Sequence, residues 1–276
     1  MADSWTQADR LRQHGFVLLH GAVERSTVAE LIQQCDQALQ TGASAEQAAS
    51  AGQAASAGQA ASAGQAASAG QAASAGQAVR ARSAAGHIYA ARNLIDAVPM
   101  VLQFWKAGGL NHFLRQQLGD AFGLVRVLYF DKPPDRSWSL PWHQDRAIAV
   151  QDHQQGVEPF SRPSVKAGVP HVIASDEQLQ RMLTLRVHLD DVDHQNGALE
   201  VIPGSHQWTG CMAQGIDSRV RIDAKAGDVL AMRPLIQHSS AASDPQTRRH
   251  RRIVHLEFAA GPDLPAGYQW HRFESC

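Results

Sequence analysis

The segment between residues 124 and 260 limits the fold most strongly, because it alternates short apolar runs with turn-forming residues and holds no long helical pattern. Clusters of Pro, Gly, Asn and Asp separate the runs. Short strands that no long helix interrupts favour a β-sandwich or barrel over a doubly wound sheet. We expect strands at Leu124–Phe130, His143–Val150, Met182–Leu189, Ala198–Ile202, Val229–Met232 and Ile253–Phe258.

The residues before this segment have a mixed pattern. A polar, helix-like run is followed by an apolar strand at Gly15–Leu19 and by an amphipathic helix at Ser26–Leu39. A further helical pattern covers Asn93–Leu118. A length of 276 residues is ordinary for one all-β domain with such additions. We therefore expect one domain, with an N-terminal α/β segment at 1–47 and a β core with supporting helices at 78–276.

Five copies of Ala-Ala-Ser-Ala-Gly-Gln lie between these two parts, from Ala48 to Gln77. The repeat has too few large apolar side chains to build a core, and its period is too short for a solenoid. Alanine favours helix, but the glycine in each copy costs about 1 kcal/mol relative to alanine. We interpret 48–77 as a spacer in a surface loop, because lengthening a loop lowers stability only slowly.

The overall charge gives no support for binding to nucleic acid or to an anionic membrane. The formal net charge is −1, and the isoelectric point is near 6.9. The sequence contains no signal-peptide pattern and no apolar run long enough to span a membrane. The three cysteines, Cys35, Cys211 and Cys276, form no Cys-x-x-Cys pair, which is typical of free thiols in a reducing compartment. We expect a cytoplasmic protein that acts on a small molecule.

The run Trp142-His143-Gln144-Asp145 places an imidazole and a carboxylate two residues apart on an expected strand. Alternate side chains of a strand share a face, so His143 and Asp145 can bind one metal ion. Two histidines and one carboxylate form the facial triad that holds iron(II) and leaves neighbouring coordination positions open. His238, which follows an apolar strand, is the best candidate for the second histidine. A His-x-Asp motif alone is more often a solvated surface pair, and 14 histidines make a distant one easy to find.

Basic residues beyond His238 strengthen the metal-site interpretation. An oxo acid such as 2-oxoglutarate could occupy the open positions on the metal. Its distal carboxylate is a group that an arginine side chain can bind through two parallel hydrogen bonds. Arg251 begins the last expected strand, and the hydroxyl of Ser240 could bind the same carboxylate. Arg248, Arg249 and Arg252 are alternatives for the arginine.

In this order, the motifs resemble those of the phytanoyl-CoA dioxygenase family of iron(II)- and 2-oxoglutarate-dependent oxygenases. The resemblance spans most of the chain outside the repeat. It implies a double-stranded β-helix, which is a cupin-like jelly-roll, with supporting helices. It also implies that His143, Asp145 and His238 bind iron and that Arg251 and Ser240 bind 2-oxoglutarate. The matching residues are Gly15–Leu19, Trp142–Asp145, Asn196–Leu199, Ile202–His206, Gly227–Val229, His238 and Arg251.

The reaction expected from this resemblance is hydroxylation of a C–H bond of a small molecule, with dioxygen consumed and succinate and carbon dioxide released. Desaturation at the same iron site is a further possible outcome. Halogenation requires the carboxylate ligand to be absent, and Asp145 argues against it. The alternative from another class is a cupin-like barrel that binds a metal or a small molecule without turnover. The sequence indicates neither the substrate nor the oligomeric state.

Other residues near these motifs have simpler interpretations. His188 and His255 alternate with apolar residues inside expected strands, so we interpret them as core residues or as groups behind the metal ligands. Trp138, Trp142 and Lys166 are near the expected ligand strand in the sequence, and they are candidates for lining a substrate pocket.

Overall fold

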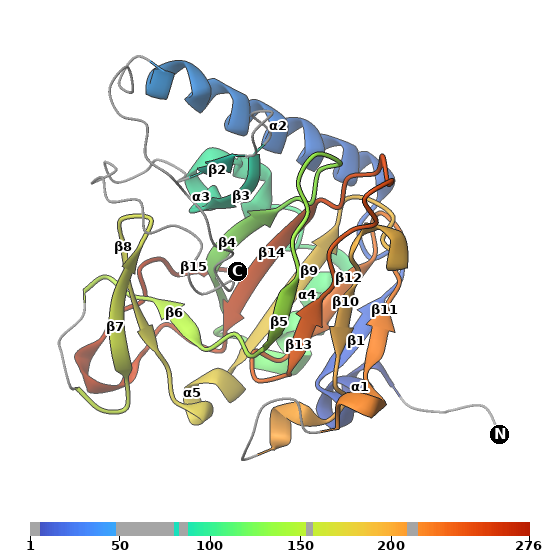
Figure 1. Ribbon diagram of the computed structural model, residues 1–276. Helices are drawn as coiled ribbons and strands as arrows, with labels where there is room; N and C mark the ends of the chain where they lie inside the picture. Colours follow the sequence, from blue (N-terminus) through green and yellow to red (C-terminus); the bar gives the residue numbers. More distant parts are fainter. Residues whose placement is uncertain (1–5, 48–79, 83–87, 153–156, 209–214) are drawn as a thin grey trace.

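Three antiparallel β-sheets form the centre of the protein (Figure 1). The computed structural model describes residues 6–47, 80–82, 88–152, 157–208 and 215–276. Sheet A has the order β1 (Phe16–Leu19), β12 (Val229–Met232), β9 (Met182–His188), β14 (Ile253–Ala259), β4 (Gly123–Phe130), β3 (Ile88–Arg92) and β2 (Arg80–Arg82), with β15 (Glu274–Ser275) also paired to β4. Sheet B has the order β11 (Val220–Ile222), β10 (Leu199–Val201), β13 (His238–Ser240) and β5 (Leu140–His143). Sheet C has the order β6 (Ala147–Ala149), β8 (Val169–Ile173) and β7 (Ser161–Lys166).

Helices flank the sheets and contribute to their packing. The α-helices are α1 (Gln7–His14), α2 (Arg25–Gln47), α3 (Leu94–Ala97), α4 (Gly108–Leu118) and α5 (Asp176–Gln180). Short 3₁₀ turns lie at η1 (Pro99–Leu102), η2 (His194–Asn196), η3 (Ser205–Gln207), η4 (Ile216–Ser218) and η5 (Pro265–Gly267). Helix α1 begins after Thr6, whose hydroxyl accepts a hydrogen bond from the backbone N–H of Asp9 at 3.1 Å. Leu31 of α2 and Leu114 of α4 pack into the same apolar core as sheet A.

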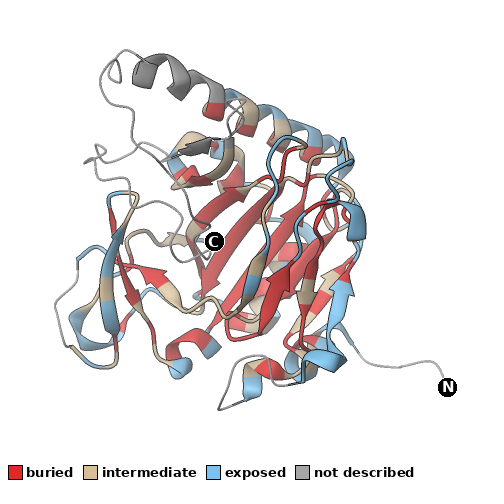
Figure 2. Cartoon of the chain, viewed as in Figure 1, coloured by how far each residue is buried: buried red, intermediate tan, exposed pale blue. Residues whose placement is uncertain are grey.

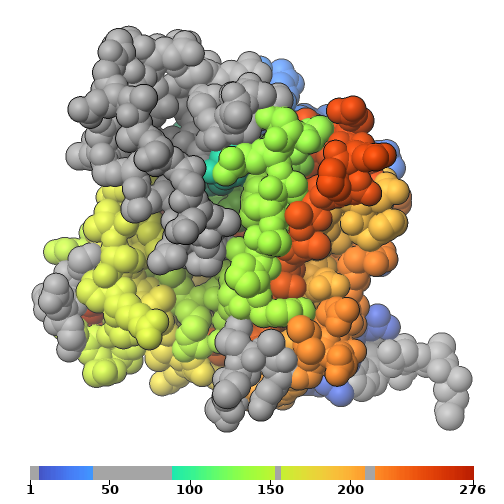
Figure 3. Space-filling view, viewed as in Figure 1, coloured from blue at the N-terminus to red at the C-terminus, as the bar shows by residue number. Residues whose placement is uncertain are grey.

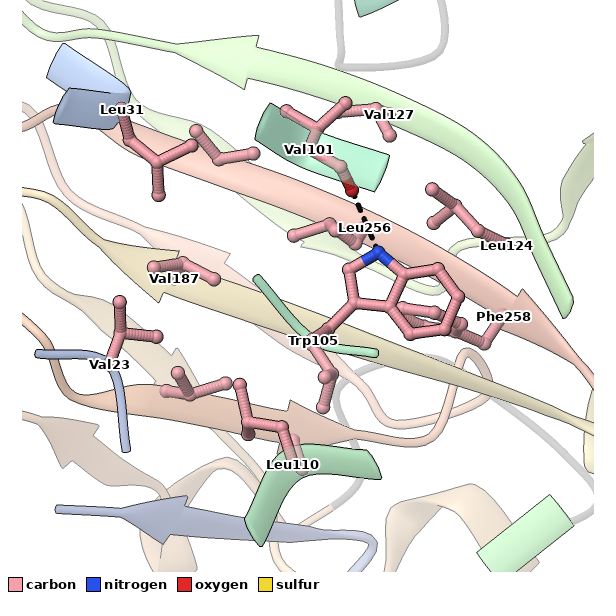
Figure 4. Packing of buried hydrophobic residues seen from close by; sticks show 14 of the residues in the cluster. Val23, Leu31, Val101, Trp105, Leu110, Leu124, Val127, Val187, Leu256 and Phe258 are labelled. Atoms are coloured by element: carbon pink, nitrogen blue, oxygen red, sulfur yellow. Dashed lines mark hydrogen bonds between the residues drawn. The ribbon is translucent and has the colours of Figure 1, made fainter. Parts of the chain in front are cut away.

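One face of sheet A is apolar and packs against the helices. Leu185 of β9 lies opposite Leu256 of β14, and both are fully buried. The ring of Trp105 packs edge-on against Phe258, with 4.9 Å between the ring centroids. The Trp105 indole N–H donates a hydrogen bond to the carbonyl of Val101 at 2.7 Å, which satisfies its polar group within the core (Figure 4). We call this the outer face of sheet A.

The opposite face of the same strands is polar, and it is buried as well. His255 lies opposite Arg186, and Glu257 lies opposite Thr184, so these four side chains share one face. Every residue of β9 and β14 is buried, as the red strands in Figure 2 show. We call this the inner face of sheet A. Buried charges and hydrogen-bonding groups are costly unless they are paired, so an inner face of this kind indicates a site.

Sheet B lies over the inner face. His255 on β14 approaches Asp145, which follows β5, with 4.0 Å between the imidazole Nε2 and a carboxylate oxygen. In the space-filling view, the green segment that leads into β5 forms the surface between the yellow hairpin of β7 and β8 and the orange strands of sheet B (Figure 3). The space between sheets A and B therefore contains the expected metal ligands.

Most of the expected elements are present, with two corrections. The expected strand His143–Val150 is two strands, because the chain leaves sheet B after His143 and joins sheet C at Ala147. The helical pattern of Asn93–Leu118 is also broken, and Pro99 and Gly108 begin separate elements within it. Proline lacks a backbone N–H, and Gly108 has a φ of 70°, so neither continues a helix.

The N-terminal segment is part of the same sheet system, since β1 pairs with β12 over four residues. The repeat at 48–77 and Cys211 lie outside the described residues. Cys35 is buried and Cys276 is exposed, and both are free thiols. None of the described helices has the length and apolar character that a membrane span requires.

Candidate iron site

The pairing of two strands brings the two expected histidine ligands together. His238 begins β13 and lies directly opposite His143, the last residue of β5. The centroids of the two imidazole rings are 4.1 Å apart. The register shifts between His238 and Ser240, and Ser240 pairs with Leu140, so the ladder has an irregularity directly beside the histidines.

Asp145 reaches the histidines from the link between sheets B and C. Its backbone N–H donates to the carbonyl of Pro234 at 2.9 Å, and the neighbouring Gln144 side chain donates to the carbonyl of Leu235 at 2.6 Å. These two bonds attach the link to the turn that precedes His238. The turn and the link therefore position the carboxylate and the distal histidine as one unit.

The three side chains converge on one point. The Nε2 atom of His143 is 3.8 Å from one carboxylate oxygen of Asp145, and the Nε2 atom of His238 is 3.6 Å from the other. One ligand atom from each residue lies within 4.8 Å of the others. Two imidazoles and one carboxylate at this separation fit a metal ion of the iron(II) type, with further coordination positions open for ligands that the protein does not supply.

Hydrogen bonds behind the imidazoles select the nitrogen that faces the metal position. Nδ1 of His143 is 2.8 Å from the carbonyl of Pro141, and Nδ1 of His238 is 3.0 Å from the carbonyl of Ile236. A carbonyl only accepts, so each Nδ1 carries the proton and each Nε2 presents a lone pair. Burial, and secondarily the charge of His143, lowers the pKa of His238 to about 4, which keeps it neutral near pH 7.

The carboxylate of Asp145 stays ionised for an electrostatic reason. Burial alone would raise its pKa, but the adjacent His238, His143 and His255 outweigh burial and hold the pKa below its usual range. An ionised Asp145 can bind a divalent cation, and metal binding requires each imidazole in its neutral form.

The four arginines that compete for the co-substrate carboxylate have different surroundings. Arg248 is exposed, Arg249 forms an ion pair with Asp193 at 2.8 Å, and Arg252 donates to a single aspartate at 2.9 and 2.7 Å. Arg251 is 3% exposed, and its Nε has no hydrogen-bond partner in the described part of the chain. A buried guanidinium without an anion is costly, so this position favours Arg251 as the group that binds one.

Ser240 lies in the same buried region, together with a lysine that the sequence did not single out. The Nζ atom of Lys132 donates to the hydroxyl of Ser240 at 3.0 Å and to the carbonyl of Ala241 at 2.5 Å. Burial, together with the charges of Arg251 and Arg186, lowers the pKa of Lys132 to about 5. Lys132, Arg251 and Arg186 thus lie in one buried basic region, next to Ser240.

Gly197 makes room for this arrangement. Its φ is 75°, and a Cβ there would lie 2.7 Å from the carbonyl of Ala241 and 2.9 Å from the Nζ of Lys132. The absence of a side chain at Gly197 therefore leaves space for the Lys132 side chain.

The inner face of sheet A holds further charged groups beside Asp145. Arg126 forms two hydrogen bonds with Glu257, at 2.9 and 2.5 Å, and Glu257 lies 3.4 Å from the Nε2 of His255. The sequence analysis placed His255 in the core or behind the ligands, and it lies behind Asp145. Alternating polar residues in strands are more typical of a solvent-facing side, so Arg126, Arg186 and Glu257 gave no separate signal.

Together, the antiparallel sheets and the His-Asp-His cluster define a cupin-like oxygenase architecture. The phytanoyl-CoA dioxygenase (PhyH) family model matches residues 11–250, so the chain belongs to this family of iron- and 2-oxoglutarate-dependent oxygenases. Iron(II) and 2-oxoglutarate, the cofactors expected from the sequence, are those of the family.

Solved structures with the same fold cover nearly the whole chain. The epimerase SnoN from nogalamycin biosynthesis is 19% identical, with a TM-score of 0.54 over 95% of this chain and 87% of that one. EctD from S. alaskensis, solved with 2-oxoglutarate and 5-hydroxyectoine, is 18% identical, with a TM-score of 0.59 over 94% of this chain and 79% of that one. The double-stranded β-helix expected from the sequence is confirmed.

A similar sequence among characterised proteins matches over a shorter length. The iron/alpha-ketoglutarate-dependent dioxygenase okaE of Penicillium ochrochloron is 39% identical over 59 residues, which is 21% of this chain and 20% of that protein. The match thus spans about a fifth of its length, and it bears on the class of chemistry rather than on a substrate.

Proposed function

We propose that this protein is an iron(II)- and 2-oxoglutarate-dependent dioxygenase that hydroxylates a C–H bond of a small-molecule substrate. The observation that carries the proposal is the convergence of His143, Asp145 and His238, with both Nε2 atoms facing the carboxylate. In this proposal, the three residues hold iron(II). Bound iron supplies the activation of dioxygen that is coupled to decarboxylation of 2-oxoglutarate to succinate.

The protein's own groups bind and orient the reactants. Arg251 and the hydroxyl of Ser240 bind the distal carboxylate of 2-oxoglutarate, which compensates the buried guanidinium charge. The carbonyl of Pro141 holds the imidazole of His143 in the metal-binding tautomer, and the carbonyl of Ile236 does the same for His238. The inner face of sheet A and the overlying sheet B exclude bulk water from the reacting bond.

Two measurements test the proposal. Oxygen consumption and succinate release should both require iron(II), 2-oxoglutarate and a substrate, which a screen across metabolite classes identifies. The mass of the product then distinguishes the reactions: a gain of one oxygen atom indicates hydroxylation, a loss of two hydrogens indicates desaturation, and an unchanged mass indicates epimerisation. A protein that binds iron but never consumes oxygen with 2-oxoglutarate would be a cupin-like binding protein instead.

A further inference from the structure

Sheet C begins directly after one of the three expected metal ligands. The backbone N–H of Ala174, which follows β8, donates to the carbonyl of Arg146 at 3.0 Å, and β6 then begins at Ala147. Asp145 is therefore only one residue from the ladder that joins β6 to β8. Alternate residues of an extended segment share a side, so Asp145, Ala147 and Ala149 lie along one side of this segment.

The other side of sheet C is apolar and fixes the sheet in place. Ile148 of β6 lies opposite Val172 of β8, and both belong to a buried cluster that also contains Val125 of β4 and Leu235. Leu235 is part of the turn before the distal histidine, so this cluster attaches sheet C to the edge of the metal site. Ala149 is also buried, but among the described residues it belongs to none of the apolar clusters.

His171 of β8 lies on the same side of sheet C as Asp145, because it is directly opposite Ala149. Its ring is 2% exposed, and its Nδ1 lies 2.8 Å from the carbonyl of Val169. A carbonyl only accepts, so Nδ1 carries the proton and Nε2 presents a lone pair. Within the part of the chain that the structure describes, this Nε2 has no hydrogen-bond partner. A buried acceptor without a donor is costly, so the position favours a ligand that supplies one.

The imidazole of His171 is neutral and is surrounded by positive charge. Burial, and secondarily the charge of Arg126, lowers its pKa to about 2. Lys166, a candidate for lining a substrate pocket, lies opposite Val169 and thus on the same side of sheet C, and its charge acts in the same direction. A neutral Nε2 accepts a hydrogen bond, and the nearby cations disfavour an ammonium group as the donor. The chemistry therefore selects an uncharged O–H or N–H group.

The surroundings of His171 leave room for such a group. Its neighbours across the strands are the small side chains of Ala149 on β6 and Ser164 on β7, and neither donates a hydrogen bond to the ring. Four residues of extended chain separate Ala149 from Asp145, which is a span of about 13 Å. A small molecule bound at the His171 ring can therefore extend to the metal position.

We infer that the Nε2 atom of His171 accepts a hydrogen bond from an uncharged donor of the substrate, a hydroxyl or an amide N–H, and thereby orients the reacting C–H bond toward the metal. The inference rests on the proposed function and names the substrate chemistry of the same site. A site that is built to bind a donor discriminates against compounds that lack it, because the buried acceptor is then left unpaired.

NMR of the protein with isotope-labelled histidine ring nitrogens tests this inference. The protein is loaded with zinc(II), which is diamagnetic and does not activate dioxygen, and is saturated with 2-oxoglutarate. Benzyl alcohol is titrated against benzyl methyl ether, cyclohexanol against methoxycyclohexane, and hexanamide against N,N-dimethylhexanamide. We expect the donor of at least one pair to shift the His171 Nε2 resonance upfield and to bind about two- to tenfold more tightly than its methylated partner. The pair in which this occurs distinguishes a hydroxyl from an amide.

Variants of His171 separate this contact from a structural role. His171→Phe keeps a ring but removes the acceptor, so it should abolish the preference, and the missing resonance identifies His171 in the spectrum. His171→Gln, whose side-chain oxygen accepts hydrogen bonds, should retain part of the preference. His194→Phe, at an exposed position, is the matched control and should leave the preference unchanged. The affinities for zinc and 2-oxoglutarate should be unchanged in all three variants, which also shows that each is folded.

Three results would overturn the inference. The first is that no donor binds more tightly than its methylated partner, and the second is that His171→Phe keeps the full preference. The third is an Nε2 resonance that is already at the hydrogen-bonded position without a probe and does not move, which would assign the donor to a bound water molecule. Calorimetry measures zinc and 2-oxoglutarate binding separately. A parent protein that binds neither contradicts the proposed function itself, so the two failures are distinguishable.

Discussion

The outer and inner faces of β9 and β14 are both buried, yet they have opposite chemistry. The outer face carries Leu185, Leu256 and Phe258, whose neighbours are apolar side chains of the core. The inner face carries Arg186 and His255, whose neighbours are charged groups and the metal ligands. Burial of the apolar outer face stabilises the fold. Burial of the charged inner face strengthens electrostatic interactions at the site but lowers the stability of the protein.

The largest expected effect is on activity, at the inner face. Asp145→Ala removes the only carboxylate of the triad, so iron binding should weaken strongly and substrate-dependent succinate release should be abolished. The free energy of unfolding should change little, because the Asp145 side chain is partly exposed and lies outside the apolar core. Iron stoichiometry and succinate release check this, with the exposed Asp217→Ala as the control. Ordinary succinate release from Asp145→Ala would show that the metal-site assignment is wrong.

The next largest effect is on stability, at the outer face. Phe258→Ala should lower the free energy of unfolding by about 3–5 kcal/mol, because it leaves a cavity beside Trp105. The affinities of the folded protein for iron and 2-oxoglutarate should stay nearly unchanged. Denaturant titration measures the first and calorimetry the second, and Val165→Ala, at an exposed position, is the control. A strong loss of 2-oxoglutarate affinity in Phe258→Ala would break the separation of the two faces.

Arg251→Ala should weaken binding of 2-oxoglutarate without lowering the stability of the protein, which is the reverse of the effect expected for Phe258→Ala. Binding of 2-oxoglutarate should weaken about ten- to hundred-fold, because a charge-assisted pair of hydrogen bonds is lost. Without metal or co-substrate, the variant should be at least as stable as the parent protein, because burial lowers the pKa of Arg251 to about 9 and the charged side chain is costly there. Calorimetry and denaturant titration test both statements, with Arg248→Ala as the exposed control. Unchanged affinity in Arg251→Ala would remove this residue from the co-substrate site.

The smallest expected effect is a loss of stability at low pH that arises from His188. Burial lowers the pKa of His188 to about 3, whereas an unfolded histidine titrates near 6.5. Between these values the unfolded state binds more protons, so the stability that a neutral His188 contributes is present above pH 6.5 and is lost as the pH falls. At pH 5 the loss should be about 2 kcal/mol relative to neutral pH.

Unfolding of the metal-free protein in urea at pH 7 and pH 5 measures this loss. His188→Asn keeps an N–H for the carbonyl of Asp228 and removes the titration, so its stability should depend less on pH than that of the parent protein. Equal pH dependence in the two proteins would show that His188 is not buried in the neutral form.

The outer face was predictable from the sequence, whereas most of the inner face was not. The strand positions follow from apolar runs such as Val229–Met232, and the structure has the same strand there. His143, Asp145 and His238 could be singled out because metal binding needs those residue types. Their approach depends on strand register, and the break between β5 and β6 does not follow from the apolar pattern of 143–150.

The basic residues illustrate why the rest required the structure. Lys132 follows a strand and precedes two prolines, and nothing in that context indicates that its side chain is fully buried beside Ser240. Four arginines near the last strand have similar sequence contexts, and only their tertiary partners separate Arg251 from Arg249 and Arg252. Contacts between residues far apart in the sequence determine which basic side chain is buried or paired, so a local sequence pattern does not predict it.

The pairing of β1 with β12 has a consequence for how the protein folds. Phe16 lies opposite Met232, so more than three quarters of the chain, 216 of 276 positions, separates two neighbouring strands of one sheet. Contacts this far apart in sequence require a large loop to close first, and proteins dominated by such contacts fold in milliseconds to seconds rather than microseconds. During synthesis on the ribosome, the edge of sheet A can close only after residue 232 has emerged. Until then, β1 has no partner strand, and its exposed backbone N–H and C=O groups are free to pair with another chain.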